Sequence, residues 1–117
     1  MREILFRGRT KSSKWVEGYY IKYENRAAGI YDGRMLHSIE PETVGQYTGL
    51  KDKNGTKIFE GDILRDTQSG ERVLMKWYEK CGCFAFANGN GSMEWEYLDI
   101  FIEDMKIVGN IYDLAHF

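Results

Sequence analysis

The sequence has little of several features that usually reveal what a protein does. Its 117 residues include one proline, two cysteines and two histidines, and the formal net charge is only −2. A nearly neutral chain exerts no strong long-range field, so charge alone indicates no particular partner. No apolar run approaches the roughly 18 residues of a membrane-spanning helix, and no apolar signal-peptide core follows the start. We therefore expect a cytoplasmic protein without a membrane partner.

The two cysteines, Cys81 and Cys83, are separated by a single glycine. A structural zinc site usually takes its ligands from two such pairs, and the sequence has no second pair. Residues two apart on a strand point to the same face but rarely reach the geometry of an unstrained disulfide. We therefore expect small, buried, reduced residues here, and neither a metal nor a cofactor.

What the sequence does contain is a repeated alternation of apolar and polar residues, which is typical of strands. Residues 14–23 are rich in the aromatic and β-branched side chains that suit a pleated surface, and Val73, Met75 and Trp77 fall on one face of a later strand. With 15% aromatic residues, these patterns predict a mainly β fold. The only helical turn that we expect lies near residues 98–103.

Glycines punctuate the predicted strands. The first strand is predicted to end at Gly8, and Gly18 indicates a bulge or a close backbone approach. Gly109 interrupts the apolar run that closes the chain, and residues 88–91 have the composition of a hairpin tip.

The densest group of turn residues lies in residues 46–64. Asn54-Gly55 is a strong signal for a tight hairpin turn between two strands. A second turn at Gly61-Asp62 begins the next strand, and an aspartate in that position accepts backbone N–H groups. We assign these four residues structural roles.

Pro41, flanked by two glutamates, cannot continue a central strand because it has no N–H to donate. We place the boundary between two parts of the chain here. Residues 1–41 are predicted to form an N-terminal β meander and residues 42–117 a second part, with both parts packed as one unit.

The sequence gives little evidence for catalytic groups. Glu60 and Asp62 are two residues apart, but paired catalytic carboxylates need environments that separate their pKa values, and a turn role is the simpler explanation. His37 and His116 have no nucleophile or carboxylate arranged around them in the sequence. We therefore predict no catalytic residue and no small-molecule ligand, and a small enzyme is the least favoured hypothesis.

Charge is distributed unevenly. Residues 1–30 carry seven basic and three acidic side chains, or +4, whereas residues 92–117 carry six acidic and one basic, or −5. Opposite charges of this kind face each other within a monomer or across an interface. The basic end also offers candidate contacts to nucleic acid: Arg2, Arg7, Arg9, Lys11 and Lys14.

Large aromatic residues are too numerous for a small fold to bury them all. They are Trp15, Tyr19, Tyr20, Tyr23, Tyr31, Tyr47, Trp77, Tyr78, Trp95 and Tyr97. Exposed Tyr and Trp side chains are favoured in protein interfaces, so the first hypothesis is a non-catalytic module that self-associates into a homo-oligomer. Because bases also stack on such rings, a nucleic-acid-binding accessory or regulatory protein is the alternative.

Three blocks of the sequence, residues 1–7, 46–64 and 107–112, resemble the YopX family of phage and prophage proteins. The resemblance implies a mostly β protein of unknown function, with an SH3-like barrel running from the Glu60-Gly-Asp-Ile segment to the C-terminus. The family has no established catalytic residues, so none is transferred. It also implies the cytoplasm of a bacterial host. The tail, residues 113–117, departs from the Asn-Pro-Glu-Leu-Leu-like ending common in the family.

Overall fold

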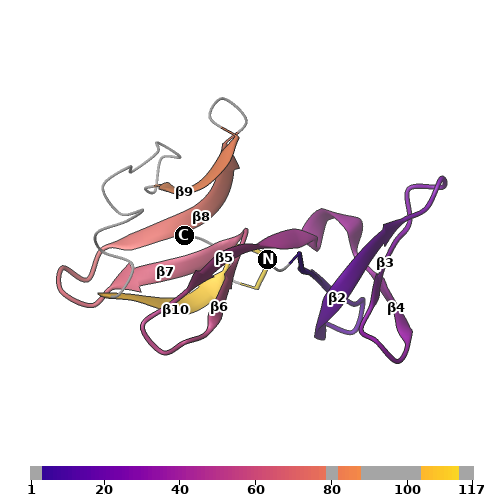
Figure 1. Ribbon diagram of the computed structural model, residues 1–117, viewed down its shortest axis with the longest axis horizontal. Coiled ribbons are helices and arrows are strands. Elements are labelled where there is room, and N and C mark those ends of the chain that lie inside the picture. Colours follow the sequence, from indigo (N-terminus) through magenta and orange to yellow (C-terminus); the bar gives the residue numbers. More distant parts are fainter. Residues whose placement is uncertain (1–3, 79–81, 88–103, 114–117) are drawn as a thin grey trace. The chain divides into compact units, whose positions relative to one another are not determined.

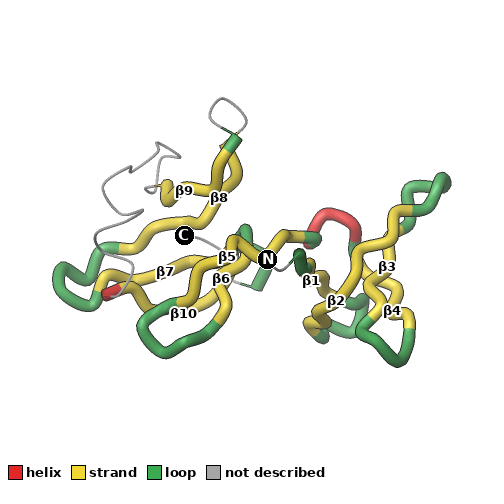
Figure 2. The backbone as a smooth tube through the Cα atoms, in the orientation of Figure 1, coloured by secondary structure: helices red, strands yellow, loops and turns green. Residues whose placement is uncertain are grey.

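The computed structural model describes residues 4–78, 82–87 and 104–113. This part of the chain is almost entirely strand and loop, so the prediction of a mainly β fold is confirmed (Figures 1 and 2). The strands are β1 (Phe6–Arg9), β2 (Trp15–Lys22), β3 (Ala28–Tyr31), β4 (Leu36–Ile39), β5 (Gly45–Lys51), β6 (Lys57–Phe59), β7 (Asp62–Asp66), β8 (Arg72–Tyr78), β9 (Cys83–Ala87) and β10 (Met105–Asn110), with a 3₁₀ helix η1 (Pro41–Thr43). The chain divides into two compact units, residues 1–47 and 48–117.

The first unit is an antiparallel sheet in which β4, β3, β2 and β1 are neighbours in that order. The beginning of β5 adds to it, because Phe6 pairs with Gln46 and Arg7 with Gly45. One face of this sheet covers a small core. Its members are the buried residues Val16, Ala28, Ile30 and Ile39, with Phe6, Tyr20 and Val44 packed against them.

Two glycines permit close packing in the first unit. The prediction that the first strand ends at Gly8 was wrong, since Gly8 lies inside β1 and pairs with Val16. A Cβ at Gly8 would collide with the Cδ1 atom of Ile39, so glycine allows the Ile39 side chain to lie directly on β1. At Gly18 a Cβ would collide with the carbonyl oxygen of Tyr31, which confirms the predicted close approach of two backbones.

The segment around Pro41 belongs to the first unit. The backbone N–H of Arg9 donates to the Thr43 hydroxyl oxygen at 2.9 Å, and that hydroxyl donates to the carbonyl oxygen of Glu40 at 2.6 Å. Thr43 is fully buried, so η1 is held against β1 and not free to act as a linker. Along the chain, the first compact unit ends at Tyr47 and the second begins at Thr48, within β5; the predicted boundary lay between residues 41 and 42.

The second unit contains the β5–β6 hairpin and a four-stranded antiparallel sheet in the order β10, β7, β8, β9. Its core consists of Ile58, Leu64, Val73, Met75, Phe86 and Met105, all fully buried. The described strands form a sheet and a hairpin and not a closed barrel.

Strand patterns in the second unit follow the sequence closely. Val73 and Met75 are buried on one face of β8 as predicted, while Trp77, near the strand end, is partly exposed. The pairing of β10 with β7 shifts register between Ile107 and Gly109, which confirms the predicted interruption. The predicted helical turn at residues 98–103 and the predicted hairpin tip at residues 88–91 lie outside the described residues. No helix in the described ranges is long and apolar enough to cross a membrane.

Candidate interaction surface

The first unit has a sheet face that points away from its core, called the outer face below. Residues paired across neighbouring strands share a face, and side chains alternate along each strand. The register of β1, β2, β3 and β4 therefore defines the members of this face. They are Arg7, Arg9, Trp15, Glu17, Tyr19, Ile21, Gly29, Tyr31, Leu36 and Ser38.

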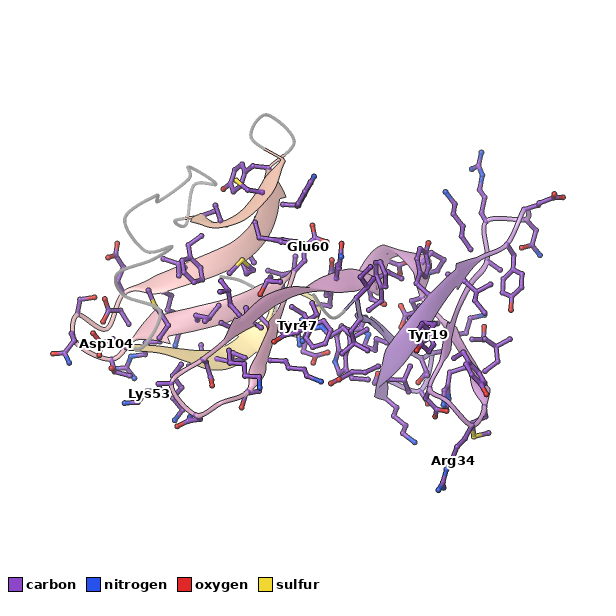
Figure 3. The ribbon with its side chains drawn as sticks, viewed as in Figure 1. Tyr19, Arg34, Tyr47, Lys53, Glu60 and Asp104 are labelled. Carbon is purple, nitrogen blue, oxygen red and sulfur yellow. The ribbon has the colours of Figure 1, made fainter. Side chains whose placement is uncertain are left out.

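A row of exposed apolar side chains crosses the outer face at right angles to the strands. Tyr19 pairs with Tyr31, and Tyr31 pairs with Leu36. Their exposed fractions are 68%, 39% and 49%. Ile21 is exposed to 38% two residues along β2 from Tyr19, and Figure 3 labels Tyr19 on β2. Four exposed apolar side chains on adjacent strand positions make one continuous surface.

The position of two side chains in this row is fixed by their surroundings. The Tyr31 hydroxyl donates to the carbonyl oxygen of Gly33 at 3.0 Å, which holds the ring to the β3–β4 turn. A Cβ at Gly29 would lie 3.0 Å from Leu36 Cδ1, so the Leu36 side chain leans over Gly29. Tyr31 and Leu36 are therefore held in place before any partner binds, which lowers the entropy cost of binding.

The turn between β3 and β4 adjoins the row and is organised by Asp32. One carboxylate oxygen accepts the N–H groups of Arg34 and Met35 at 2.8 and 2.9 Å, and the other lies 2.7 Å from His37 Nε2. These bonds, first that from Met35 and then that from His37, hold the pKa of Asp32 well below its usual range. Met35 itself is 60% exposed at the turn.

The side chains predicted to contact nucleic acid differ in their exposure and in their contacts within the protein. The Arg7 guanidinium lies 4.8 Å from the Trp15 ring centre, with Nε and Nη2 shielded from solvent. Arg9 also lies over Trp15, at 6.0 Å, and its Nε donates to Glu40 at 3.4 Å. Lys11 and Lys14 are exposed in the turn between β1 and β2. Arg2 lies outside the described residues.

Charged side chains exposed on the first unit are of both signs. Five are basic and four are acidic among its described residues. They are Lys11, Lys14, Lys22, Arg26 and Arg34, and Glu17, Glu24, Asp32 and Glu42. Exposed charges of both signs on a unit with an exposed apolar surface suit a protein interface. A surface that binds nucleic acid usually presents an excess of positive charge.

A shallow hollow of about 390 Å³ opens on the same unit. It is lined by Lys11, Ile39, Glu40, Pro41 and Glu42. Nothing in the sequence pointed to it, because its residues come from the β1–β2 turn, the end of β4 and η1. Met35 was missed for a similar reason: a single methionine in a turn has no periodic signal.

The turn residues predicted in residues 46–64 have structural roles. Asp52 N–H donates to the Thr56 carbonyl at 2.9 Å, and Gly55 N–H to the Asp52 carbonyl at 3.0 Å. The hairpin loop therefore has three residues, Lys53 to Gly55, and Gly55 has the positive φ of 80° that such a loop needs at this position. Asn54 donates its backbone N–H to Asp52 Oδ1 at 2.9 Å.

The second turn also matches its predicted role. Asp62 is buried and accepts the backbone N–H of Phe59 at 2.8 Å, and Gly61 has a φ of 95°. Burial raises the pKa of Glu60, and a hydrogen bond from the backbone N–H of Trp77 partly offsets this rise.

Asp52 is a buried carboxylate that the sequence did not single out. It accepts N–H groups from Asn54, Thr56 and Ile107.

The described residues include few groups with metal or redox chemistry. Within the described ranges, no three His, Cys, Asp or Glu side chains gather as metal ligands would. Cys83 is half-buried and disulfide-bonded, so the prediction of a reduced residue is wrong for this position. The argument against a disulfide assumed that both cysteines lie within one regular strand. Cys83 is the first residue of β9. Cys81 lies outside the described residues.

Fold and surface together define a mainly β protein of two compact units, the first of which presents an ordered apolar face. The family model described as "YopX protein" matches residues 4–116. The chain therefore belongs to the YopX family. No curated protein matches it in sequence.

Proposed function

We propose that this protein is a non-catalytic interaction module that self-associates through the outer face of its first unit. The observation that carries this proposal is the row formed by Tyr19, Tyr31 and Leu36, with Ile21 beside it. Exposed apolar side chains scattered singly are ordinary, but a contiguous and ordered row indicates a contact surface. Tyrosine is also among the residues enriched at the centres of interfaces.

The partner that suits this face is a second copy of the chain. In a two-fold interface the same patch meets itself, so its charges must be compatible with themselves. The first unit exposes charges of both signs, five basic and four acidic, so cations of one copy can lie near anions of the other. A rim of one sign would repel its own copy.

The test is the molar mass in solution, measured by light scattering across a dilution series. We expect the mass to rise above that of one chain as concentration increases. Tyr19→Ser should weaken association about tenfold, the usual effect of removing a central aromatic contact. Val108→Ser on β10 is the matched control, since Val108 is also exposed but lies in the second unit. A strict monomer at high micromolar concentration would refute the proposal.

Nucleic-acid binding is the second candidate, favoured by the exposed Lys11 and Lys14 in the turn between β1 and β2. Arg7 and Arg9 contribute less to it, since their guanidinium groups lie over Trp15 and Arg9 also binds Glu40. The test is the affinity for labelled single-stranded DNA at several salt concentrations. Affinity should fall steeply with salt if phosphates are bound, and affinity that is absent at low salt or does not vary with salt would exclude this candidate.

The remaining features of the proposal follow from the family. They are a phage or prophage setting, the cytoplasm of a bacterial host, and an SH3-like barrel built on the second unit. The barrel is supported by a core that the β5–β6 hairpin residue Ile58 shares with Leu64, Val73 and Phe86 of the four-stranded sheet. A small enzyme stays the least favoured function, and a screen for hydrolase activity with the purified protein would test it.

A further inference from the structure

Two features of different shape lie at opposite ends of β4. Before the strand, the β3–β4 turn carries Arg34 and Met35, both exposed; Figure 3 labels Arg34 at this turn. After the strand, the hollow is lined by Ile39, Pro41 and Glu42 among others. Four residues of strand span roughly 13 Å. One short strand therefore carries a projection at its start and a depression at its end.

The projection is held in shape by its own hydrogen bonds. Asp32 binds the backbone N–H groups of Arg34 and Met35, and its second oxygen lies beside His37. The exposed Met35 side chain is unbranched and polarisable, so it adapts to the shape of an apolar depression. Arg34 places a positive charge next to it, and Asp32 places a negative charge at its base.

The hollow has the complementary chemistry. Ile39 and Pro41 are the apolar residues of its lining, and only 4% of the Ile39 surface is exposed. The Glu40 carboxylate accepts a hydrogen bond from Arg9, so the charges left exposed at the rim are those of Glu42 and Lys11. The hollow thus offers an apolar surface, one anion (Glu42) and one cation (Lys11). The β3–β4 turn offers an apolar side chain (Met35), one cation (Arg34) and one anion (Asp32).

We propose that the hollow binds the β3–β4 turn of a second copy, with Met35 on the apolar lining and Arg34 beside Glu42. Asp32 of the inserted turn then lies near Lys11. This inference rests on the proposed self-association but uses a different pair of surfaces. Because projection and hollow are different patches, the contact is head-to-tail, and it produces rings or open chains and not a closed pair. The protein then assembles beyond the dimer that the outer face alone provides.

The experiment is a charge-reversal cycle measured by sedimentation velocity at low salt. Arg34→Glu and Glu42→Arg should each weaken the growth of species larger than a dimer about tenfold, because each places like charges in contact. The double variant Arg34→Glu with Glu42→Arg restores opposite charges and should recover most of that loss. Lys106→Glu, a charge reversal at an exposed site on β10, is the matched control and should leave assembly unchanged.

The outcomes separate this inference from the function on which it rests. If the single variants weaken assembly and the double variant restores it, the head-to-tail contact is supported. If the wild type forms dimers that neither reversal affects, or if the double variant fails to restore larger species, the contact is refuted while self-association stands. A wild type that stays monomeric refutes both proposals.

Discussion

The sheets of the two units differ in how their faces are used. In the second unit both faces carry fully buried side chains: Leu64 and Met75 on one, Ile63 and Ala85 on the other. In the first unit the face bearing Val16 and Ile30 is buried, whereas the opposite face exposes a row of large apolar side chains. In a sheet that is buried on both faces, the apolar side chains stabilise the fold and are not available to a partner. The sheet with an ordered, exposed apolar face is where binding is expected.

The largest expected effect concerns the buried carboxylate of the second unit. Asp52→Ala leaves the N–H groups of Asn54, Thr56 and Ile107 without their acceptor. We expect a loss of about 3 kcal/mol in the free energy of unfolding, measured with urea, because three backbone donors in a partly buried site lose a charged acceptor. Lys53→Ala in the same loop, an exposed residue, should change it by less than about 0.5 kcal/mol. Equal effects of the two substitutions would contradict this account of Asp52.

A pair of substitutions compares the two sheets directly. Ala85→Leu adds three carbon atoms to a fully buried position of the second unit and should destabilise it by about 2 kcal/mol. Ser38→Leu adds similar volume on the outer face and should change the free energy of unfolding by less than about 0.5 kcal/mol, since Ser38 is exposed. Thermal unfolding of both variants measures the difference. A large cost at Ser38 would mean that the outer face is already covered.

The smallest expected effects are differences in pH dependence with opposite signs. The folded-state pKa of Asp32 is lowered, so its contribution to stability is present above its ordinary pKa of about 4 and lost as the pH falls below it. The folded-state pKa of Glu60 is raised, so its contribution decreases as the pH rises above about 4.

Urea unfolding of two amide variants at pH 4 and pH 7 shows in which direction each carboxyl group changes the stability with pH. Relative to the wild type, Asp32→Asn should be more destabilising at pH 7 than at pH 4, and Glu60→Gln should be relatively more stable at pH 7. The result that would overturn the assignment is a pair of variants whose pH profiles shift in the same direction.

The sequence predicted local structure better than it predicted the surface. Asn54-Gly55 and Gly61-Asp62 specify their turns through φ angles and short-range hydrogen bonds, all within a few residues, so their roles were visible. Gly8 was misjudged because its role depends on Ile39, thirty-one residues later. The exposure of Tyr19 could not be distinguished from burial by alternation alone, since both faces of that strand carry aromatic residues.

The hollow and the β3–β4 turn were not visible in the sequence for a related reason. The lining of the hollow combines Lys11 with residues 39–42, and only the three-dimensional path of the chain brings them together. The five nucleic-acid candidates stay a prediction. The sequence did not reveal that Arg7 and Arg9 would lie against Trp15.

The Asp52 carboxylate also has a consequence for the order of folding events. Its Oδ1 closes a loop only a few residues long, and such hairpins form within roughly microseconds. Its Oδ2 accepts the N–H of Ile107, fifty-five residues later in the chain, and a contact at that separation forms late because the entropy cost of loop closure comes first. One side chain thus joins an early event to a late one. We expect Ile107→Ala to accelerate unfolding while hardly slowing folding, and denaturant-dependent kinetics would show the opposite if β10 docks early.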